Sequence, residues 1–215
     1  MKFCFVAITL LLFSYTTWGQ ISQPIAIKWV DTLTGDYSFT KRWTYPPGIE
    51  MKSDGRAGCA DGGFCPQRCY AMQDSNGIVY KDSAQVFYSL LDTNHLNITL
   101  QCESSCNEWM GSELMEVEYF SNTSVFCHTL NGPSTHSSLQ MLIVENNCNA
   151  FIDLNSIKPK SSMVYNCNSG FITIDKTLWD KGILKAEFNF NFDAKDKNQK
   201  SITLKGKTYV KMKTP

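Results

Sequence analysis

Cysteine is the residue type whose number and spacing most directly suggest chemistry in this chain. Nine cysteines occur in 215 residues, and eight of them lie beyond residue 50: Cys59, Cys65, Cys69, Cys102, Cys106, Cys127, Cys148 and Cys167. The spacings Cys65-x3-Cys69 and Cys102-x3-Cys106 are similar to those of zinc fingers, whose ligands are thiolates. In an oxidising compartment the same thiols form disulfides. The compartment therefore decides how these cysteines are interpreted.

Residues 1–19 have the three-part order of a secretory signal peptide. Lysine follows the first methionine, an apolar run spans residues 3–13, and small residues precede a junction between Gly19 and Gln20. The run is too short to cross a bilayer core, which needs about 20 residues. We expect cleavage at this junction and delivery to the periplasm or the cell exterior. We also expect no transmembrane segment after signal cleavage.

Export changes the interpretation of the cysteines. The eight that remain after cleavage are an even number, and we expect disulfides among them and no metal site. Sequence alone does not choose among the many pairings. Because Cys59, Cys65 and Cys69 are three neighbours, at least one of them reaches a distant partner or stays free.

Other residues have the types needed for catalysis or ion binding, but their patterns are weak. His136 stands beside serines, yet sequence neighbours rarely form a nucleophile with its base, and no Gly-x-Ser-x-Gly motif occurs. Glu116 and Glu118 are two apart on a predicted strand, roughly 6–7 Å apart, which suits glycoside hydrolysis or a solvated acidic face. Asp54 and Asp61 lack a calcium-loop pattern. We predict no catalysis and no cofactor.

The tryptophans and the glycosylation sequons each allow two interpretations. Trp43, Trp109 and Trp179 could stack on sugars, although tryptophans in β proteins more often pack in the core. Asn97 and Asn122 begin Asn-x-Ser/Thr sequons, which are modified only in a eukaryotic secretory route.

The elements that must position these residues are mostly strands. In residues 183–192, Leu184, Ala186, Phe188, Phe190 and Phe192 alternate with polar residues, which predicts a half-buried strand with a phenylalanine face. We expect an antiparallel β-sandwich or open barrel. The predicted strands are 25–30, 78–80, 96–102, 113–120, 124–130, 139–145, 150–154, 163–166, 171–174, 183–192 and 201–213.

One helix and one irregular loop complete the predicted elements. Residues 81–91 carry an apolar stripe, and Asp82 with Gln85 forms a capping-box pattern at the start. Residues 52–69 are rich in glycine and cysteine and predict a disulfide-containing loop. We therefore divide the mature chain into an N-terminal segment, 20–80, and a β domain, 81–215, which the helix enters.

Charge is balanced overall but unevenly distributed. Residues 20–157 carry 7 basic and 15 acidic side chains, whereas residues 158–215 carry 12 basic and 5 acidic ones. The two regions could dock through this difference, or the lysines could simply prevent edge-to-edge strand pairing. The zero net charge gives no reason to expect a nucleic-acid partner.

Two long stretches resemble exported proteins of flavobacteria and related Bacteroidetes. The ending SGFITIDKTLWDKGILKAEFNFNF, followed by SITLKGKTYVKM, is similar to a recurring C-terminal ending of those proteins. The pieces WTYPPGIE, FCPQRCYAM, NGIVYKDSAQVFYSLLDTNHL and THSSLQM look like a group from the same bacteria that has no known activity. The resemblance implies an envelope or extracellular location and a β-sandwich-like ending, and it implies no activity.

These observations favour an exported, non-enzymatic envelope or secreted protein that binds a ligand or has a structural role. Its partner would be an extracellular protein or glycan. The alternative is an extracellular hydrolase acting on glycan or peptide. The position of Glu116 and His136 discriminates between the two. A deep pocket shared with a second titratable group favours the enzyme, and an open sheet face disfavours it.

Overall fold

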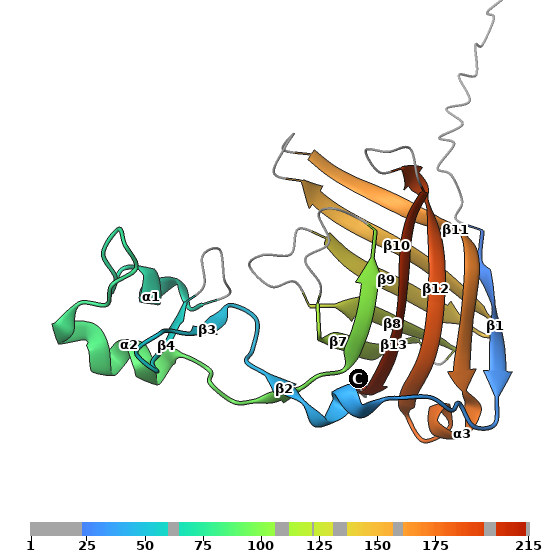
Figure 1. The fold of residues 1–215 in the computed structure, drawn as a ribbon, viewed down its shortest axis with the longest axis horizontal. Coiled ribbons are helices and arrows are strands. Elements are labelled where there is room, and N and C mark those ends of the chain that lie inside the picture. The colour runs from blue at the N-terminus through green and yellow to red at the C-terminus, as the bar shows by residue number, and fades with distance from the viewer. Residues whose placement is uncertain are drawn as a thin grey trace, which may run out of the picture.

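The computed structural model contains one large curled sheet and a small cysteine-containing lobe, joined by a narrow two-stranded link (Figure 1). The residues that the structure describes are 23–59, 65–105, 112–121, 123–130, 137–156, 161–195 and 201–213.

Nine strands form the large sheet in the order β6-β13-β12-β11-β1-β10-β9-β8-β7. Neighbouring strands are antiparallel except β1 and β11, which run parallel. Beyond the start of β1, strands β10 and β11 pair directly with each other. The strands are β1 (Ile25–Val30), β6 (Leu100–Ser104), β7 (Met115–Ser121), β8 (Ser124–Thr129), β9 (Ser137–Val144), β10 (Asn147–Ser156), β11 (Ser161–Asp175), β12 (Ile183–Lys195) and β13 (Ser201–Lys211).

The sheet curls until its two ends approach each other. Just after β13, the backbone N–H of Lys213 donates to the carbonyl oxygen of Val117 on β7, at 2.7 Å. Next to the start of β6, the N–H of Thr99 donates to the carbonyl of Glu113, at 2.9 Å. The predicted class, a mainly β antiparallel sandwich or open barrel, is confirmed.

The core lies inside the curl and follows the alternation along each strand. The phenylalanine face of β12 is buried as predicted, with Phe188, Phe190 and Phe192 each at most 1% exposed. Strand β9 contributes Leu139, Met141 and Ile143 to the same cluster. Because each strand buries every second side chain, the intervening side chains point outward and remain available for binding.

The predicted strands 163–166 and 171–174 are parts of one 15-residue strand, β11. Gly170 separates them in the sequence, with φ 138°, and a Cβ there would lie 2.1 Å from the carbonyl oxygen of Asn189. The register between β11 and β12 also shifts between Cys167 and Ser169. The backbones of β11 and β12 come so close at this position that only glycine fits. Gly170 therefore allows β11 to continue and does not end the strand.

The lobe has its own small core. Disulfide-bonded Cys59 and Cys65 pack there with Cys69, Phe87 and Leu91. Strands β2 (Trp43–Thr44) and β5 (Leu96–Asn97) pair to link the lobe to the sheet. The lobe elements are β3 (Ile49–Met51), β4 (Ala57–Cys59), α1 (Gln67–Tyr70), the 3-10 turn η2 (Lys81–Ser83) and α2 (Ala84–Leu90).

This arrangement differs from the expected division at residue 80. Strand β1 belongs to the centre of the large sheet, and the helix packs with the lobe cysteines. The helix itself is present as η2 followed by α2, but the expected capping box is not: Ser83 is the N-cap of α2 and its side chain makes no capping hydrogen bond. In the described part of the chain, no helix is long and apolar enough to cross a membrane.

Candidate functional site

A segment that follows β1 crosses the outer face of strands β12 and β13 near the end of the sheet (Figure 1). We call residues 31–42 the strap; it includes the 3-10 turn η1 (Ser38–Lys41). The Lys185 ammonium on β12 donates to the carbonyl of Leu33, at 2.5 Å. On the same strand, the carbonyl of Ala186 accepts from the Tyr37 hydroxyl, at 3.2 Å. These bonds position the strap as one wall above the sheet.

Asp175 anchors the strap at its start. This buried carboxylate ends β11 and caps the short helix α3 (Lys176–Trp179). It accepts one bond from the N–H of Leu33 and one from the N–H of Leu178, both at 2.9 Å. Burial opposes ionisation, but these backbone donors and the nearby Lys185 ammonium outweigh it and lower the pKa of Asp175.

Tyr37 gives the strap a second anchor. The ammonium of Lys185 lies 4.7 Å from its ring centroid and that of Lys207 lies 5.6 Å away. Burial raises the pKa of the Tyr37 phenol, so the ring stays neutral. A neutral ring between two lysines combines cation–π attraction with packing. The strap wall is therefore built from specific contacts.

Beside the strap lies a groove of about 410 Å³, which we call the outer groove. This volume falls within the range of small-ligand sites, roughly 300–1,000 Å³. Strands β6, β11, β12 and β13 supply most of its lining, and the strap supplies Asp36. The lining residues are Asp36, Gln101, Cys102, Glu103, Phe171, Glu187, Phe188, Asn189, Lys205, Gly206 and Lys207.

The groove combines an exposed aromatic ring with unused polar groups. Phe171 is 46% exposed. In the described part of the chain, the side chains of Gln101, Glu187 and Asn189 have no hydrogen bond or ion pair with other protein groups. Lys205 pairs with Glu103 at 2.9 Å. A ring face with amide and carboxylate groups around it suits a ligand that has both C–H and hydroxyl surfaces.

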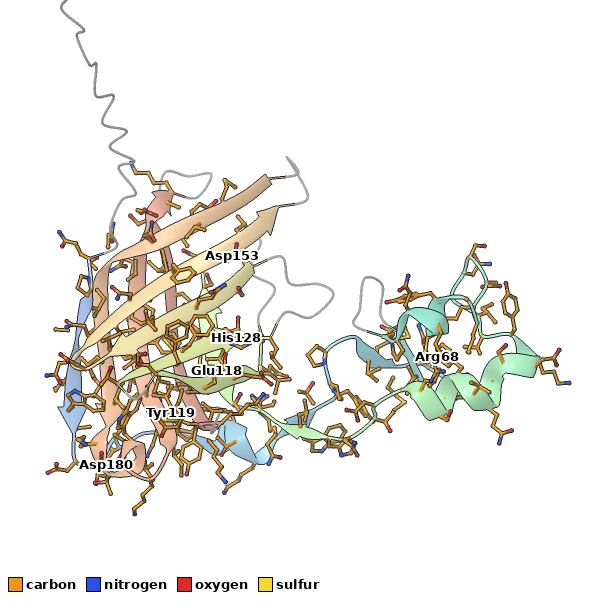
Figure 2. The ribbon with its side chains drawn as sticks, turned by 180° about the vertical axis from the view of Figure 1, so that it is seen from behind. Arg68, Glu118, Tyr119, His128, Asp153 and Asp180 are labelled. Atoms are coloured by element: carbon orange, nitrogen blue, oxygen red, sulfur yellow. A yellow bond between two sulfur atoms is a disulfide. The ribbon has the colours of Figure 1, made fainter. Side chains whose placement is uncertain are left out.

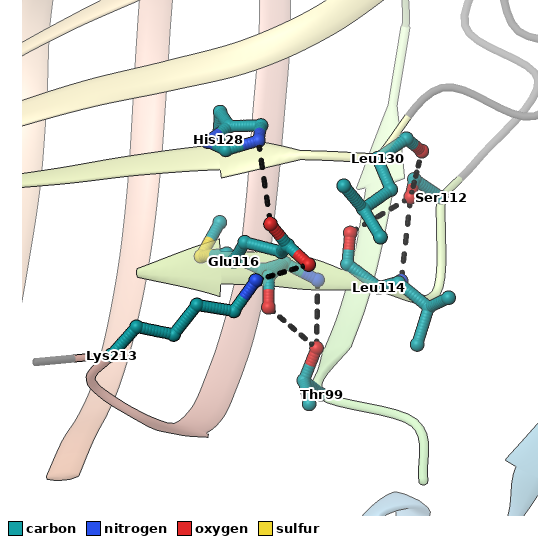
Figure 3. A network of polar contacts seen from close by, with 8 residues as sticks. Thr99, Ser112, Leu114, Glu116, His128, Leu130 and Lys213 are labelled. Carbon is teal, nitrogen blue, oxygen red and sulfur yellow. Dashed lines mark hydrogen bonds and ion pairs between the residues drawn. The ribbon is translucent and has the colours of Figure 1, made fainter. Parts of the chain in front are cut away.

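The candidate carboxylates lie on a different part of the sheet. Glu116 on β7 has one carboxylate oxygen 2.7 Å from the Lys213 ammonium and the other 3.9 Å from Nε2 of His128 on β8 (Figure 3). Next to it, Thr99 bonds both backbone polar groups of Met115. The carboxylate is therefore engaged in an ion-pair network that joins the sheet to the chain after β13.

This network is on the outer face of β7 and β8. The side chains of Glu116 and His128 are 33% and 29% exposed, and Glu118 is exposed on the same face, as is seen from behind (Figure 2). The His128 ring stacks on Phe126, and its buried Nδ1 has no partner in the described part of the chain. Glu116 is therefore paired with basic groups, and the two glutamates do not face each other across an enclosed site.

The cysteines divide into several environments. Cys59 and Cys65 form a disulfide, which removes Cys65 from any Cys65-x3-Cys69 zinc pattern. Cys69, Cys127 and Cys148 are buried thiols, so the expectation that they are bridged does not match the structure. The physical reason is position: Cys127 and Cys148 occupy core-facing sites on strands β8 and β10, where a thiol packs as a small apolar group.

Cys102 and Cys167 also face the core, on β6 and β11. Cys106 lies outside the described residues, and so do four other candidates: Asp61, Trp109, Asn122 and His136. The described residues contain no group of three or more His, Cys, Asp or Glu side chains that could hold a metal ion.

The remaining candidates are dispersed. Trp43 stacks on His95 in the link to the lobe, with ring centroids 3.7 Å apart. Asp54 accepts from the N–H of Arg56 at the exposed tip of the β3–β4 hairpin. Asn97 is exposed on β5. Trp179, at the end of α3, packs edge-to-face on Trp29 near the end of β1, with ring centroids 5.3 Å apart.

Sequence reasoning did not identify the outer groove. Its polar residues occupy outward positions of ordinary alternating strands, which carry no motif. The only signal was the interleaving of Asn189 with the buried phenylalanines. Comparisons with family models, curated proteins and solved structures found no match to this chain.

Proposed function

We propose that this chain is an exported, non-enzymatic binding protein that holds a neutral saccharide in the outer groove. The observation that carries the proposal is the exposed Phe171 ring beside the unpartnered side chains of Gln101, Glu187 and Asn189. The ring offers a face for sugar C–H groups, and the amides and carboxylate offer donors and acceptors for hydroxyls.

The electrostatics of the groove support a ligand without net charge. Asp36, Glu103 and Glu187 are opposed there by Lys205 and Lys207, so neither sign dominates. Lys205 is already paired with Glu103, and Lys207 contacts the strap through Tyr37 and the carbonyl of Asp36. Neither lysine of the groove is therefore free to pair with an anionic ligand.

An export route fits the same proposal. The N-terminal signal pattern, the Cys59–Cys65 disulfide and the resemblance to exported proteins of Bacteroidetes agree with an oxidising compartment. Supporting a non-enzymatic role, Glu116 is neutralised by Lys213 on the outer face of the sheet instead of facing a second carboxylate.

The test is calorimetric titration of the exported chain with neutral cello-, xylo-, manno- and chito-oligosaccharides. We expect one of these classes to bind, and Phe171→Ala to weaken that binding by about tenfold. Phe120→Ala is the matched control because Phe120 is 74% exposed on β7, away from the groove. It should leave the affinity unchanged.

Two outcomes would contradict the proposal. Binding that survives both Phe171→Ala and Asn189→Ala would place the ligand elsewhere. Release of reducing ends from the bound oligosaccharide would favour the hydrolase, and loss of that release in Glu116→Gln would assign it to the β7 network.

A further inference from the structure

A second hollow lies where the end of β1, the β9–β10 turn and α3 meet, next to the first residue of the strap. It is open to solvent, has a volume of about 400 Å³ and is lined by Trp29, Val30, Asp31, Glu145, Asn146, Lys176 and Trp179. We propose that this hollow, which we call the tryptophan hollow, binds an organic cation such as a quaternary ammonium group. The inference concerns a site separate from the outer groove and stands independently of its ligand.

The two indole rings provide the walls that a cation needs. Trp29 and Trp179 meet edge-to-face at 72°, with centroids 5.3 Å apart, so their faces point in different directions around the same space. Both rings also pack against the sheet core. The Trp29 N–H donates to the Asn146 side chain, at 2.9 Å, which fixes the ring orientation. Tryptophan faces are the strongest aromatic partners of cations.

Two carboxylates and one ammonium group line the hollow together with these rings. Asp31 and Glu145 both line the hollow, and within the described residues neither carboxylate has an ion-pair partner. Alkylammonium groups are recognised by aromatic faces together with such carboxylates. An anion would meet both carboxylates, and a neutral ligand would leave their charge unused.

Glu145 occupies its position at a conformational cost. Its φ is +53°, and it is the one residue other than glycine with positive φ in the described part of the chain. Glycine or asparagine would adopt this turn conformation more easily. A strained acidic residue beside two tryptophans is explained if its carboxylate has a role in binding.

The chain already places a cation in this setting. The Lys176 ammonium lies 5.9 Å from the Trp29 ring centroid while it pairs with Asp180. The hollow therefore accommodates positive charge over the indole. An external cation would compete with Lys176 for this position, and this competition gives the proposal a distinctive test.

The experiment is calorimetric titration of the exported chain with tetramethylammonium chloride, against sodium chloride at equal ionic strength. Neopentyl alcohol is the neutral probe of similar shape. We expect saturable binding of tetramethylammonium and much weaker binding of neopentyl alcohol. Trp179→Leu should weaken the affinity about tenfold, and Glu145→Gln about threefold. Lys176→Met should strengthen it about threefold because the competing ammonium is gone.

Trp179→Leu could weaken binding by destabilising the fold, which a lower melting temperature would reveal. Glu145→Gln and Lys176→Met are surface changes, so they test the proposal without that effect. Trp43→Leu is the control for loss of an exposed tryptophan elsewhere, since Trp43 lies in the link to the lobe. Equal binding of neopentyl alcohol, or unchanged affinity in both Glu145→Gln and Lys176→Met, would overturn the proposal. Absence of tetramethylammonium binding would do the same.

Discussion

At the scale of single residues, the buried carboxylate of Asp175 holds two segments of the chain in place. Its two carboxylate oxygens accept backbone hydrogen bonds from the strap and from α3. The strap forms a wall of the outer groove, and α3 contributes two residues to the tryptophan hollow. A single buried carboxylate thus supports both proposed sites.

Asp175→Asn should lower the free energy of unfolding by about 2–4 kcal/mol, because a charge-assisted cap is replaced by a neutral amide. The folded-state pKa of Asp175 lies below its ordinary value of 3.8. The stabilisation is therefore complete well above pH 3.8 and is lost as the pH falls through the lowered folded-state pKa. Urea unfolding of both proteins at pH 7 and near pH 2 measures this. An equal difference at both pH values would contradict it.

At the scale of elements, the long strands β11 and β12 depend on a close backbone approach at Gly170. A Cβ at this position would lie 2.1 Å from the carbonyl oxygen of Asn189, whose side chain lines the outer groove. The strand pair and the groove are therefore coupled through one glycine.

Gly170→Ala should destabilise the protein by at least about 3 kcal/mol, since the positive φ and the clash both oppose it. Gly55→Ala is the matched control: Gly55 also has positive φ, at +82°, but a Cβ there would meet nothing within 4 Å. The control should cost about 1 kcal/mol. Chemical denaturation compares the two, and equal losses would mean that the clash is relieved by movement of the strands.

The core-facing cysteines of β8 and β10 have a chemical consequence. Burial raises the pKa of Cys127 well above its ordinary value and that of Cys148 to about 12. Because the thiolate is the reactive form, we expect both thiols to resist a thiol-labelling reagent at pH 8 in the folded protein and to react after unfolding. Mass spectrometry of labelled peptides locates the modified residues. Peptides that remain disulfide-linked after unfolding without reductant would contradict it.

At the scale of the whole molecule, the lobe and the sheet have separate hydrophobic cores. The lobe core is small and includes the Cys59–Cys65 disulfide, whereas the sheet core contains no disulfide among its described residues. Exposed large apolar side chains also occur in the lobe, among them Met51, Tyr70, Ile78, Tyr80 and Val86. We therefore expect the two parts to differ in stability.

Replacing Cys59 and Cys65 together by serine should destabilise the lobe by about 2 kcal/mol, the loop-closure value for a short loop. The sheet should keep its stability because no contact of its core is removed. Limited proteolysis should then cut between residues 45 and 95 before it cuts the sheet. Equally rapid loss of amide protection in β12 would show that the two parts unfold as one.

Much of the fold was predictable from local patterns. The strict alternation of residues 183–192 predicted β12 and its phenylalanine face. The apolar patterns also predicted the bounds of β1, β7, β8 and β9 to within a few residues. The division of the chain was not predictable, because the insertion of β1 between β10 and β11 depends on pairing between residues about 120–150 positions apart. Sequence order gave no sign that the helix belongs with the cysteine lobe.

The sequence by itself determined the β class and the buried strand faces, since these depend on periodicity and local composition. Only the tertiary structure decided which cysteines pair and which pack as thiols. It also decided that Glu116 meets Lys213, and that Phe171, Gln101 and Asn189 share a groove. The physical reason is that strand pairing brings together outward-facing residues from distant segments, and no local pattern encodes that proximity.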